Sequence, residues 1–241
     1  MPRLASAGVS DAEQTSSAAD VPDADAVAAA FGLGAALAPL EPNEKSTWQT
    51  WRLRTGCGDA FVKQVDCTGW QAELERAMAF ERAAATAGVP MPRPLEPVRP
   101  AFEYAAVVDG STLRAYAWVD GRAVHPGDDL ADWLGSTLAT LHRIAPIEAA
   151  EPAWYGLYPP EQWQAWQRVG HARGQAWADV LGSRLTDIAE LSGRIADTFT
   201  GAGDYVLAHQ DLRPHNLLVT PAGPVLTDWD SVGPDSAALL E

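Results

Sequence analysis

Length, composition and charge set the first limits on this chain. It has 241 residues, of which 47% are hydrophobic, which is enough for one large or two small domains with a real core. Its formal net charge of −15 argues against nucleic acid and anionic membranes as main partners, because both are negatively charged. The charge is compatible with a cationic substrate, but a generally acidic, soluble surface is the simpler interpretation.

The cysteines and the apolar segments indicate a reduced, cytoplasmic protein. Cys57 and Cys67 are too few for a disulfide framework. No apolar run is long enough to span a bilayer, so we expect no membrane partner. The apolar segment 27–38 follows a cluster of aspartates, which is the wrong charge for a signal peptide.

The N-terminal part is predicted to be a tail followed by a short helix. Residues 1–22 are rich in Ala, Ser and acidic side chains without an apolar period, so we expect them to be disordered. Asp23 or Asp25 can cap a helix through Phe31, which ends at the glycines that follow.

Residues 48–65 predict a β-hairpin, because strand formers flank a turn at 56–59. The two-residue period of a strand puts Phe61, Lys63 and Val65 on one face. A lysine between two large apolar side chains is costly to bury unless it is paired. Lys63 is therefore either part of a site or an edge lysine whose amine reaches water.

Residues 70–87 predict a helix that ends at a Gly-Val-Pro segment. Its apolar stripe also contains Glu81, which places one carboxylate on the inward face. Glu73 and Glu75 lie on the same helix. The alternative is that all three glutamates are solvated surface charges.

The middle of the chain predicts a second hairpin and a helix. The hairpin spans 103–119 around an Asp-Gly-Ser turn, and Trp118 lies near its end. Asp128 or Asp129 then caps a helix through residue 144.

Two further helices are predicted, one over 159–181 and another that begins at Ser183. Trp163, Trp166 and Trp177, from a total of ten tryptophans, lie on the first of them. Aromatic faces attract cations, so these three side chains could line a substrate pocket. More often such a stripe belongs to the core.

The most informative stretch is 205–230. Three short strands are predicted there, separated by a polar loop and a Pro-Ala-Gly-Pro turn: 205–208, 217–220 and 225–227. Asp211, Asn216 and Asp228 are thereby held at the ends of short, stiff elements.

These side chains suit phosphoryl transfer, in which a protein positions the nucleophile and holds Mg²⁺ against the phosphates. Asp211 could accept the proton of an attacking hydroxyl, and Asn216 and Asp228 offer the oxygen ligands that Mg²⁺ prefers. The spacing His209-x-Asp211-x4-Asn216, with an aspartate about a dozen residues on, matches a kinase catalytic loop and its metal-binding aspartate. The alternative is a polar loop that caps two strands.

The segments HQDLRPHNLLV and LTDWD resemble the motifs of the aminoglycoside phosphotransferase family, part of the choline-kinase-like enzymes. Those enzymes carry D-W-D or D-W-E where protein kinases have D-F-G. The resemblance implies an α+β, bilobal protein-kinase-like fold, with a small antiparallel sheet in the N-lobe and a mostly helical C-lobe.

The same resemblance implies a nucleotide site. Lys63 corresponds to the lysine that holds the α- and β-phosphates of ATP. Glu81 lies 18 residues further on, close to the usual gap between this lysine and the glutamate that pairs with it, so we expect a Lys63–Glu81 ion pair. Glu73 and Glu75 are its rivals for that role.

Two weaker assignments complete the predicted ATP site. Ser46 lies where the family has its phosphate-covering loop and could donate a hydrogen bond to phosphate, although a plain β-turn fits equally well. Trp118 lies in a segment that resembles the connector between lobes, whose backbone meets adenine, although a simple strand end fits as well.

We therefore expect a disordered tail over 1–22, a nucleotide-binding N-lobe over 23–118 and a catalytic C-lobe over 119–241. The predicted function is ATP- and Mg²⁺-dependent phosphorylation of a small-molecule hydroxyl, with an aminoglycoside or similar antibiotic as acceptor. The alternatives are a kinase of a metabolite such as choline, homoserine or a sugar amine, and a nucleotide-binding protein without transfer activity. The family usually continues for several helices after D-W-D, so we expect a truncated chain or an abbreviated acceptor site.

Overall fold

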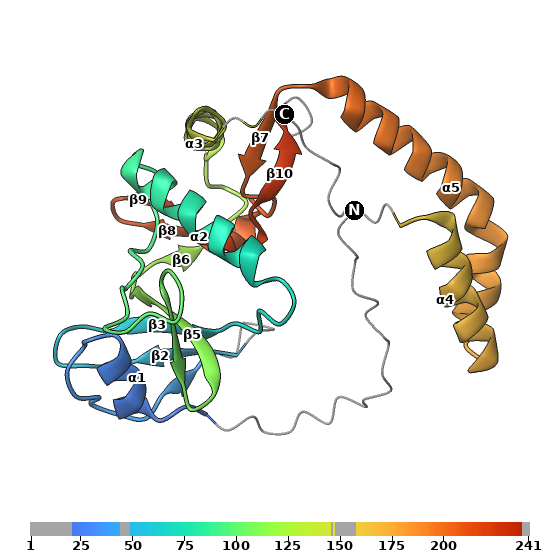
Figure 1. Cartoon of the computed structure of the whole chain (residues 1–241). Coiled ribbons are helices and arrows are strands. Elements are labelled where there is room, and N and C mark those ends of the chain that lie inside the picture. The colour runs from blue at the N-terminus through green and yellow to red at the C-terminus, as the bar shows by residue number, and fades with distance from the viewer. Residues whose placement is uncertain (1–20, 44–48, 146, 148–157, 238–241) are drawn as a thin grey trace. The chain divides into compact units, whose positions relative to one another are not determined.

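The computed structural model describes residues 21–43, 49–145, 147 and 158–237 (Figure 1). Ser46 and the predicted tail up to residue 20 lie outside the described residues. The chain divides into two compact units, residues 1–134 with 211–231 and residues 135–210 with 232–241. Among the described helices, none combines the length and the apolarity needed to cross a membrane.

The first unit is built on a five-stranded antiparallel sheet in the order β1-β2-β3-β5-β4. Both predicted hairpins are confirmed, since β2 pairs with β3 and β4 pairs with β5. The strands are β1 (Glu41–Pro42), β2 (Thr50–Leu53), β3 (Ala60–Gln64), β4 (Ala105–Val108) and β5 (Ser111–Ala117).

One face of this sheet carries the hydrophobic core. The short helix α1 (Ala24–Ala30) begins at Asp23, whose carboxylate accepts a hydrogen bond from the Ala26 amide, as predicted. Val27 and Phe31 of this segment pack in one cluster with Val62 of β3 and its neighbours on the same face. Lys63 lies on the opposite face, because side chains alternate along a strand.

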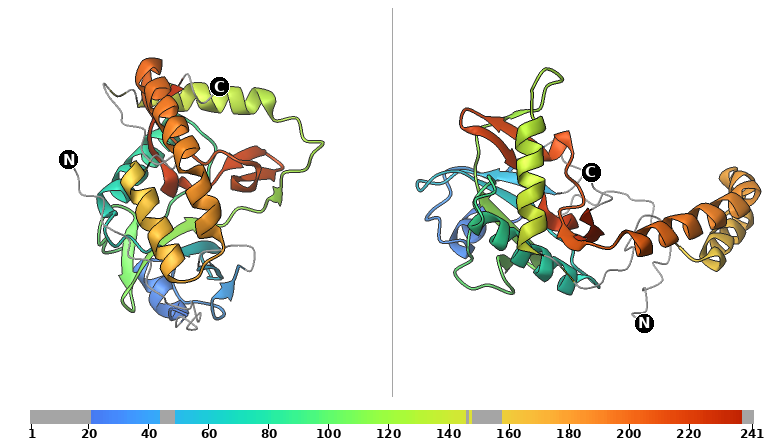
Figure 2. Two further views of the ribbon diagram at one scale, coloured as in Figure 1. Left: turned by 90° about the vertical axis from the view of Figure 1, so that its right-hand side faces the viewer. Right: turned by 90° about the horizontal axis from the view of Figure 1, so that it is seen from above.

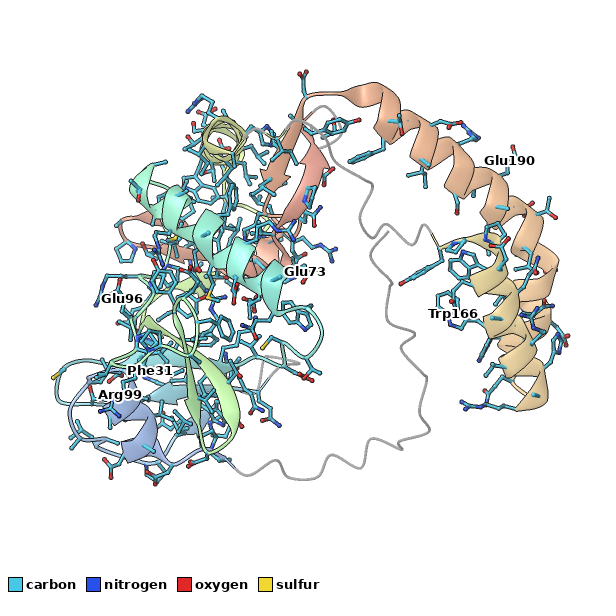
Figure 3. All side chains as sticks on the ribbon, viewed as in Figure 1. Phe31, Glu73, Glu96, Arg99, Trp166 and Glu190 are labelled. Atoms are coloured by element: carbon cyan, nitrogen blue, oxygen red, sulfur yellow. The ribbon has the colours of Figure 1, made fainter. Side chains whose placement is uncertain are left out.

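Helix α2 (Gln71–Thr86) carries the three glutamates that were candidate partners of Lys63. Its predicted stripe is confirmed, because Leu74, Met78 and Glu81 are all fully buried. Glu73, labelled on α2 in Figure 3, is exposed instead. Helical periodicity thus distinguishes Glu81 from Glu73, and Glu75 is half-buried.

The same unit contains the predicted catalytic segment. A three-stranded sheet in the order β6-β8-β9 brings together β6 (Arg122–Ala123), β8 (Leu217–Thr220) and β9 (Gly223–Leu226). Two 3₁₀ turns flank this hairpin, η1 (Pro214–Asn216) and η2 (Trp229–Ser231). Asp228 lies between β9 and η2.

The second unit contains most of α3 (Ala131–Ile144), together with α4 (Pro160–Ala172), α5 (Trp177–Ala202) and the antiparallel pair β7 (Tyr205–Ala208) and β10 (Gly233–Ser236). Of the two predicted caps of α3, Asp129 accepts a hydrogen bond from the Ala131 amide at 3.3 Å.

The predicted boundary between the next two helices was wrong. The chain leaves α4 at Arg173, and Gly174 adopts a positive φ of 64°, the left-handed conformation that glycine tolerates best. Gly182, which separates the two predicted helices, lies inside α5. A Cβ there would lie 2.1 Å from Gln167 of α4, so this glycine permits close packing of two helices.

Figure 2 shows α4 and α5 side by side in both views. Tyr158, Trp163 and Trp166, the last labelled in Figure 3, form an edge-to-face cluster with ring centroids 4.8–5.7 Å apart. Trp163 also lines a pocket of about 270 Å³ between α4 and α5. The role of these rings in binding a substrate stays a prediction.

The close approach of α4 and α5 at Gly170 gives a stability prediction. A Cβ at Gly170 would lie 2.6 Å from the Trp177 ring and 2.9 Å from Ala178. We expect Gly170→Ala to lower the free energy of unfolding by about 1–3 kcal/mol through overpacking. Gly193→Ala is the matched control, because nothing lies within 4 Å of its Cβ position in α5. It should gain up to about 1 kcal/mol of helix propensity. Urea unfolding followed by circular dichroism measures both, and equal stabilities of the two variants would contradict the packing.

Candidate active site

The candidate site is organised around two cations on neighbouring strands. Lys63 of β3 and Arg114 of β5 are direct partners in the antiparallel register, so their side chains lie on the same face. Lys63 is 8% exposed and Arg114 is 1% exposed. Two adjacent, buried positive charges require carboxylates close by.

Asp230 of η2 bridges the two cations. Its Oδ2 lies 2.6 Å from Lys63 Nζ, and its Oδ1 accepts a hydrogen bond from Arg114 Nη1. Asp228 adds a second carboxylate to Lys63, with 2.6 Å between Oδ1 and Nζ. The lysine is therefore held between two aspartates that are two residues apart in the chain.

The predicted Lys63–Glu81 ion pair was wrong. Glu81 is fully buried, as predicted, but its Oε2 accepts a hydrogen bond of 2.5 Å from Arg114 Nη2. The physical reason is that Arg114 lies directly beside Lys63 and presents a guanidinium whose two terminal nitrogens reach Glu81 and Asp230 at once. The carboxylate of α2 thus reaches Lys63 only through Arg114 and Asp230.

Burial and neighbouring charges shift the pKa values of these side chains in opposite directions. Burial by itself would lower the pKa of Lys63, but Asp230 and Asp228 outweigh it and leave that pKa above its ordinary value. Burial raises the pKa of Asp230, whereas Arg114 and Lys63 lower it by more, so the net shift is downward. For Glu81 the burial outweighs the effect of Arg114, and its pKa is raised. Asp230 is therefore the buried carboxylate that keeps its charge most firmly.

The predicted catalytic loop holds Asp211 from several directions. Asn216 Nδ2 donates to the Asp211 carboxylate at 2.6 Å and to its carbonyl at 2.8 Å. Arg213 Nε lies 2.8 Å from the other carboxylate oxygen. The Asp211 side chain is 21% exposed, so it is oriented by these contacts yet open on one side.

Backbone contacts join this loop to Asp228. The amide and the hydroxyl of Thr227 both donate to the Asn216 carbonyl, each at 2.9 Å. Asp228 itself has a positive φ of 64°, which is uncommon for a residue other than glycine and is tolerated best by Asp and Asn. The structure therefore brings Lys63, Asp211, Asn216 and Asp228 into one bonded network within the first unit.

The arrangement fits a magnesium ion bound together with phosphate. Asn216 Nδ2 donates a hydrogen bond to Asp211, which leaves Asn216 Oδ1 as the atom that could bind a metal. The Asp228 side chain is 36% exposed. No cluster of three His, Cys, Asp or Glu side chains suitable for a metal occurs among the described residues. Mg²⁺ needs no such cage, because it is commonly bound by one or two carboxylates, waters and substrate phosphates.

A pocket of about 140 Å³ lies beside these groups. Lys63, Asp228, Asp230 and Trp70 are among the residues that line it. This volume is below the roughly 300–1,000 Å³ of sites for whole ligands, so the pocket could enclose only part of a ligand as large as a nucleotide.

Trp118 was the residue predicted to lie near adenine. Trp118 follows β5, and its indole donates to Asp120 while the Arg52 guanidinium lies 4.3 Å from its ring centroid. Its backbone amide donates to the Asp59 carbonyl, so that amide is already bonded. Contact of Trp118 with adenine stays a prediction.

Sequence reasoning missed Arg114 and left the role of Asp230 open. A fully buried arginine in a strand is rare enough to indicate a nearby carboxylate pair. The signal was present in the alternation of β5, where Arg114 and Tyr116 share a face between buried apolar residues.

Comparison with known proteins places the chain among phosphotransferases. The model of a family described as "Phosphotransferase enzyme family" matches residues 40–238. A comparison with curated proteins gives no match. Because the solved structures below share less than a fifth of their sequence with this chain, they bear on the fold alone.

Three solved structures illustrate the similarity. A spectinomycin phosphotransferase in complex with ADP and spectinomycin has a TM-score of 0.53 and 15% identity, covering 82% of this chain and 64% of that one. An amicoumacin kinase in complex with AMP-PNP and Ca²⁺ has a TM-score of 0.58 and 15% identity, with coverages of 82% and 60%. A choline/ethanolamine kinase family protein from Mesorhizobium loti has a TM-score of 0.54 and 17% identity, with coverages of 88% and 64%. The predicted α+β, kinase-like fold is confirmed, and the chain spans a little under two thirds of the first of these relatives.

The contact between Glu81 and Arg114 predicts a selective loss of stability. Removing one partner of a buried ion pair leaves an uncompensated charge, so Glu81→Gln should lower the free energy of unfolding by about 3 kcal/mol. Glu73→Gln, on the exposed face of the same helix, should change it by less than about 0.5 kcal/mol. Urea unfolding at pH 7 separates them, and equal effects would show that Arg114 does not depend on Glu81.

The lowered pKa of Asp230 predicts how its contribution depends on pH. A carboxylate with a folded-state pKa below its unfolded-state value stabilises the fold above the unfolded-state pKa of about 4, and this contribution disappears as the pH falls through the folded-state pKa. The stability difference between wild type and Asp230→Asn should be about 3 kcal/mol at pH 7 and should shrink below about pH 4. Urea unfolding from pH 7 to pH 3 measures it, and a difference that stays constant to pH 3 would contradict this assignment.

Proposed function

Because the chain belongs to the phosphotransferase enzyme family, we propose that it transfers the γ-phosphoryl group of ATP to a hydroxyl group of a small molecule. The observation that carries the proposal is the bonded network from Lys63 through Asp228 and Asn216 to Asp211. It joins a phosphate-binding cation, two oxygen ligands and a carboxylate base over short distances.

Each side chain has a defined task in this reaction. Asp211, oriented by Asn216, accepts the proton as the acceptor oxygen attacks the γ-phosphorus and ADP departs. Lys63 binds the nucleotide phosphates. Asn216 Oδ1 and Asp228 would hold Mg²⁺, which supplies neutralisation of the phosphate charge when it is bound.

The favoured acceptor is an aminoglycoside or a similar antibiotic. Two of the solved relatives are described with antibiotics bound or as antibiotic phosphotransferases. The net charge of −15 would attract a cationic acceptor, in the cytoplasm where ATP is available. A metabolite such as choline is the second candidate, because another relative belongs to the choline/ethanolamine kinases.

An acceptor screen tests the proposal. ATP consumption is measured with Mg²⁺ and single additions of aminocyclitol antibiotics, choline, homoserine and amino sugars. Stimulation by an antibiotic supports the first acceptor class, and stimulation by one metabolite alone supports the second. Nucleotide binding without turnover across a broad panel would contradict the transfer function.

The role of Asp211 gives a prediction about turnover. Asp211→Asn keeps the side-chain shape but removes the base, so kcat should fall by about 10²-fold or more while ADP binding is retained. Asp187→Asn, an exposed aspartate on α5 that pairs with Arg184, is the control and should leave kcat unchanged. Undiminished kcat in Asp211→Asn would exclude the base.

A further inference from the structure

We propose that Asp230 is the positioning residue for Lys63, and that it retains the lysine while Asp228 is released to the metal. This inference rests on the proposed function, because it assigns tasks within the same site. It gives Asp230 the task that the sequence had suggested for Glu81.

Asp230 is fixed from both sides, whereas Asp228 is not. The two oxygens of Asp230 are divided between Lys63 and Arg114, and its side chain is 16% exposed. The Asp228 side chain is 36% exposed, and within the part of the chain that the structure describes it forms an ion pair with Lys63. Moving Asp230 away would leave Arg114, which is 1% exposed, with a buried charge that Glu81 alone must balance.

The charges of the cluster favour the same division. Lys63 and Arg114 carry two positive charges, and the buried carboxylates of Asp230 and Glu81 carry two negative charges. Asp228 adds one negative charge beyond this balance, and it is the most exposed member of the cluster. A divalent cation can therefore take Asp228 without leaving an unbalanced charge inside the protein.

Glu81 influences the position of Lys63 only indirectly in this arrangement. It holds Arg114, Arg114 holds Asp230, and Asp230 holds Lys63. Asp228 immediately precedes η2 and Asp230 lies within it, so the lysine and the proposed metal ligand are positioned by one short stretch of backbone.

The test is the magnesium requirement for nucleotide binding. ADP binding is measured by calorimetry over a series of Mg²⁺ concentrations for wild type, Asp230→Asn, Asp230→Glu and Asp228→Asn. In Asp230→Asn the lysine depends on Asp228, which then competes with the metal. The Mg²⁺ concentration at half-saturation should rise by about 10-fold, as for other residues that support metal ligands. Asp230→Glu, which keeps the charge, should recover part of this loss.

The matched control is Glu103→Gln, which removes a carboxylate from an ion pair with Arg82 elsewhere in the unit. It should leave the Mg²⁺ requirement unchanged. An unchanged requirement in Asp230→Asn would mean that Asp230 is only structural and would overturn the proposal. Complete loss of Mg²⁺-dependent binding, as expected for Asp228→Asn, would overturn it too, because Asp230 would then be a metal ligand.

A second measurement needs no variant of the buried cluster. Lys45 and Lys63 are the two lysines of the chain, so ¹⁵N-lysine labelling of Lys45→Arg gives one ammonium signal in the NMR spectrum. The Lys63 ammonium should stay hydrogen-bonded and slow to exchange when Mg²⁺ alone is added, because Asp230 retains it. Loss of the signal on addition of Mg²⁺ would overturn the proposal.

These readouts separate the inference from the proposed function. Neither requires phosphoryl transfer, so a protein that binds Mg²⁺ and ADP as described but consumes no ATP would contradict the function alone. If ADP fails to bind the wild type, the function is contradicted and the lysine signal still tests Asp230.

Discussion

Lys63 and Arg114 occupy paired positions on two neighbouring strands. The rest of the site follows from the free-energy cost of burying two positive charges side by side. Like charges at directly opposed positions repel, and burial removes the water that would screen them. The carboxylates that compensate them come from Glu81 of α2, 33 residues before Arg114, and from Asp230 of η2, 116 residues after it. The sheet, the helix and the turn after β9 are thus bound together by charge as well as by apolar contact.

This electrostatic origin explains why the site is both polar and well ordered. A buried ion pair adds little net stability over an apolar pair, but breaking it is expensive, so the partners specify one geometry. Asp230 lies 2.6 Å from the lysine amine and is itself held by Arg114, so the position of this amine is fixed by two linked ion pairs.

Much of the fold could be predicted from local signals. The Asp23 cap, both hairpins, the stripe of α2 and the hairpin that follows Asn216 each depend on residues that are neighbours in the chain. The boundary between α4 and α5 could not be predicted in this way, because Gly174 and Gly182 are both glycines and either could end a helix. Only the packing of Gly182 against Gln167 shows that Gly182 lies inside a helix.

The same limit applies to the site. The motif spacing identified Asp211, Asn216 and Asp228 as members of one network, since all three lie in one continuous segment. The partner of Lys63 depends on strand register, which places Arg114 beside it, and register is a property of the assembled sheet. Periodicity could show that Glu81 is buried, but it could not show which cation it meets. Ser46 lies outside the described residues, and the adenine contact of Trp118 stays a prediction.

Trp229, the residue between Asp228 and Asp230, connects this turn to helix α2. It is 1% exposed, and its ring packs 6.1 Å, centroid to centroid, from Phe80, the residue before Glu81 on α2. Helix and turn are therefore coupled both by this aromatic contact and by the guanidinium of Arg114. A shift of α2 would carry the turn with it, so this helix cannot move independently of the turn, and the candidate site would form or come apart as one body.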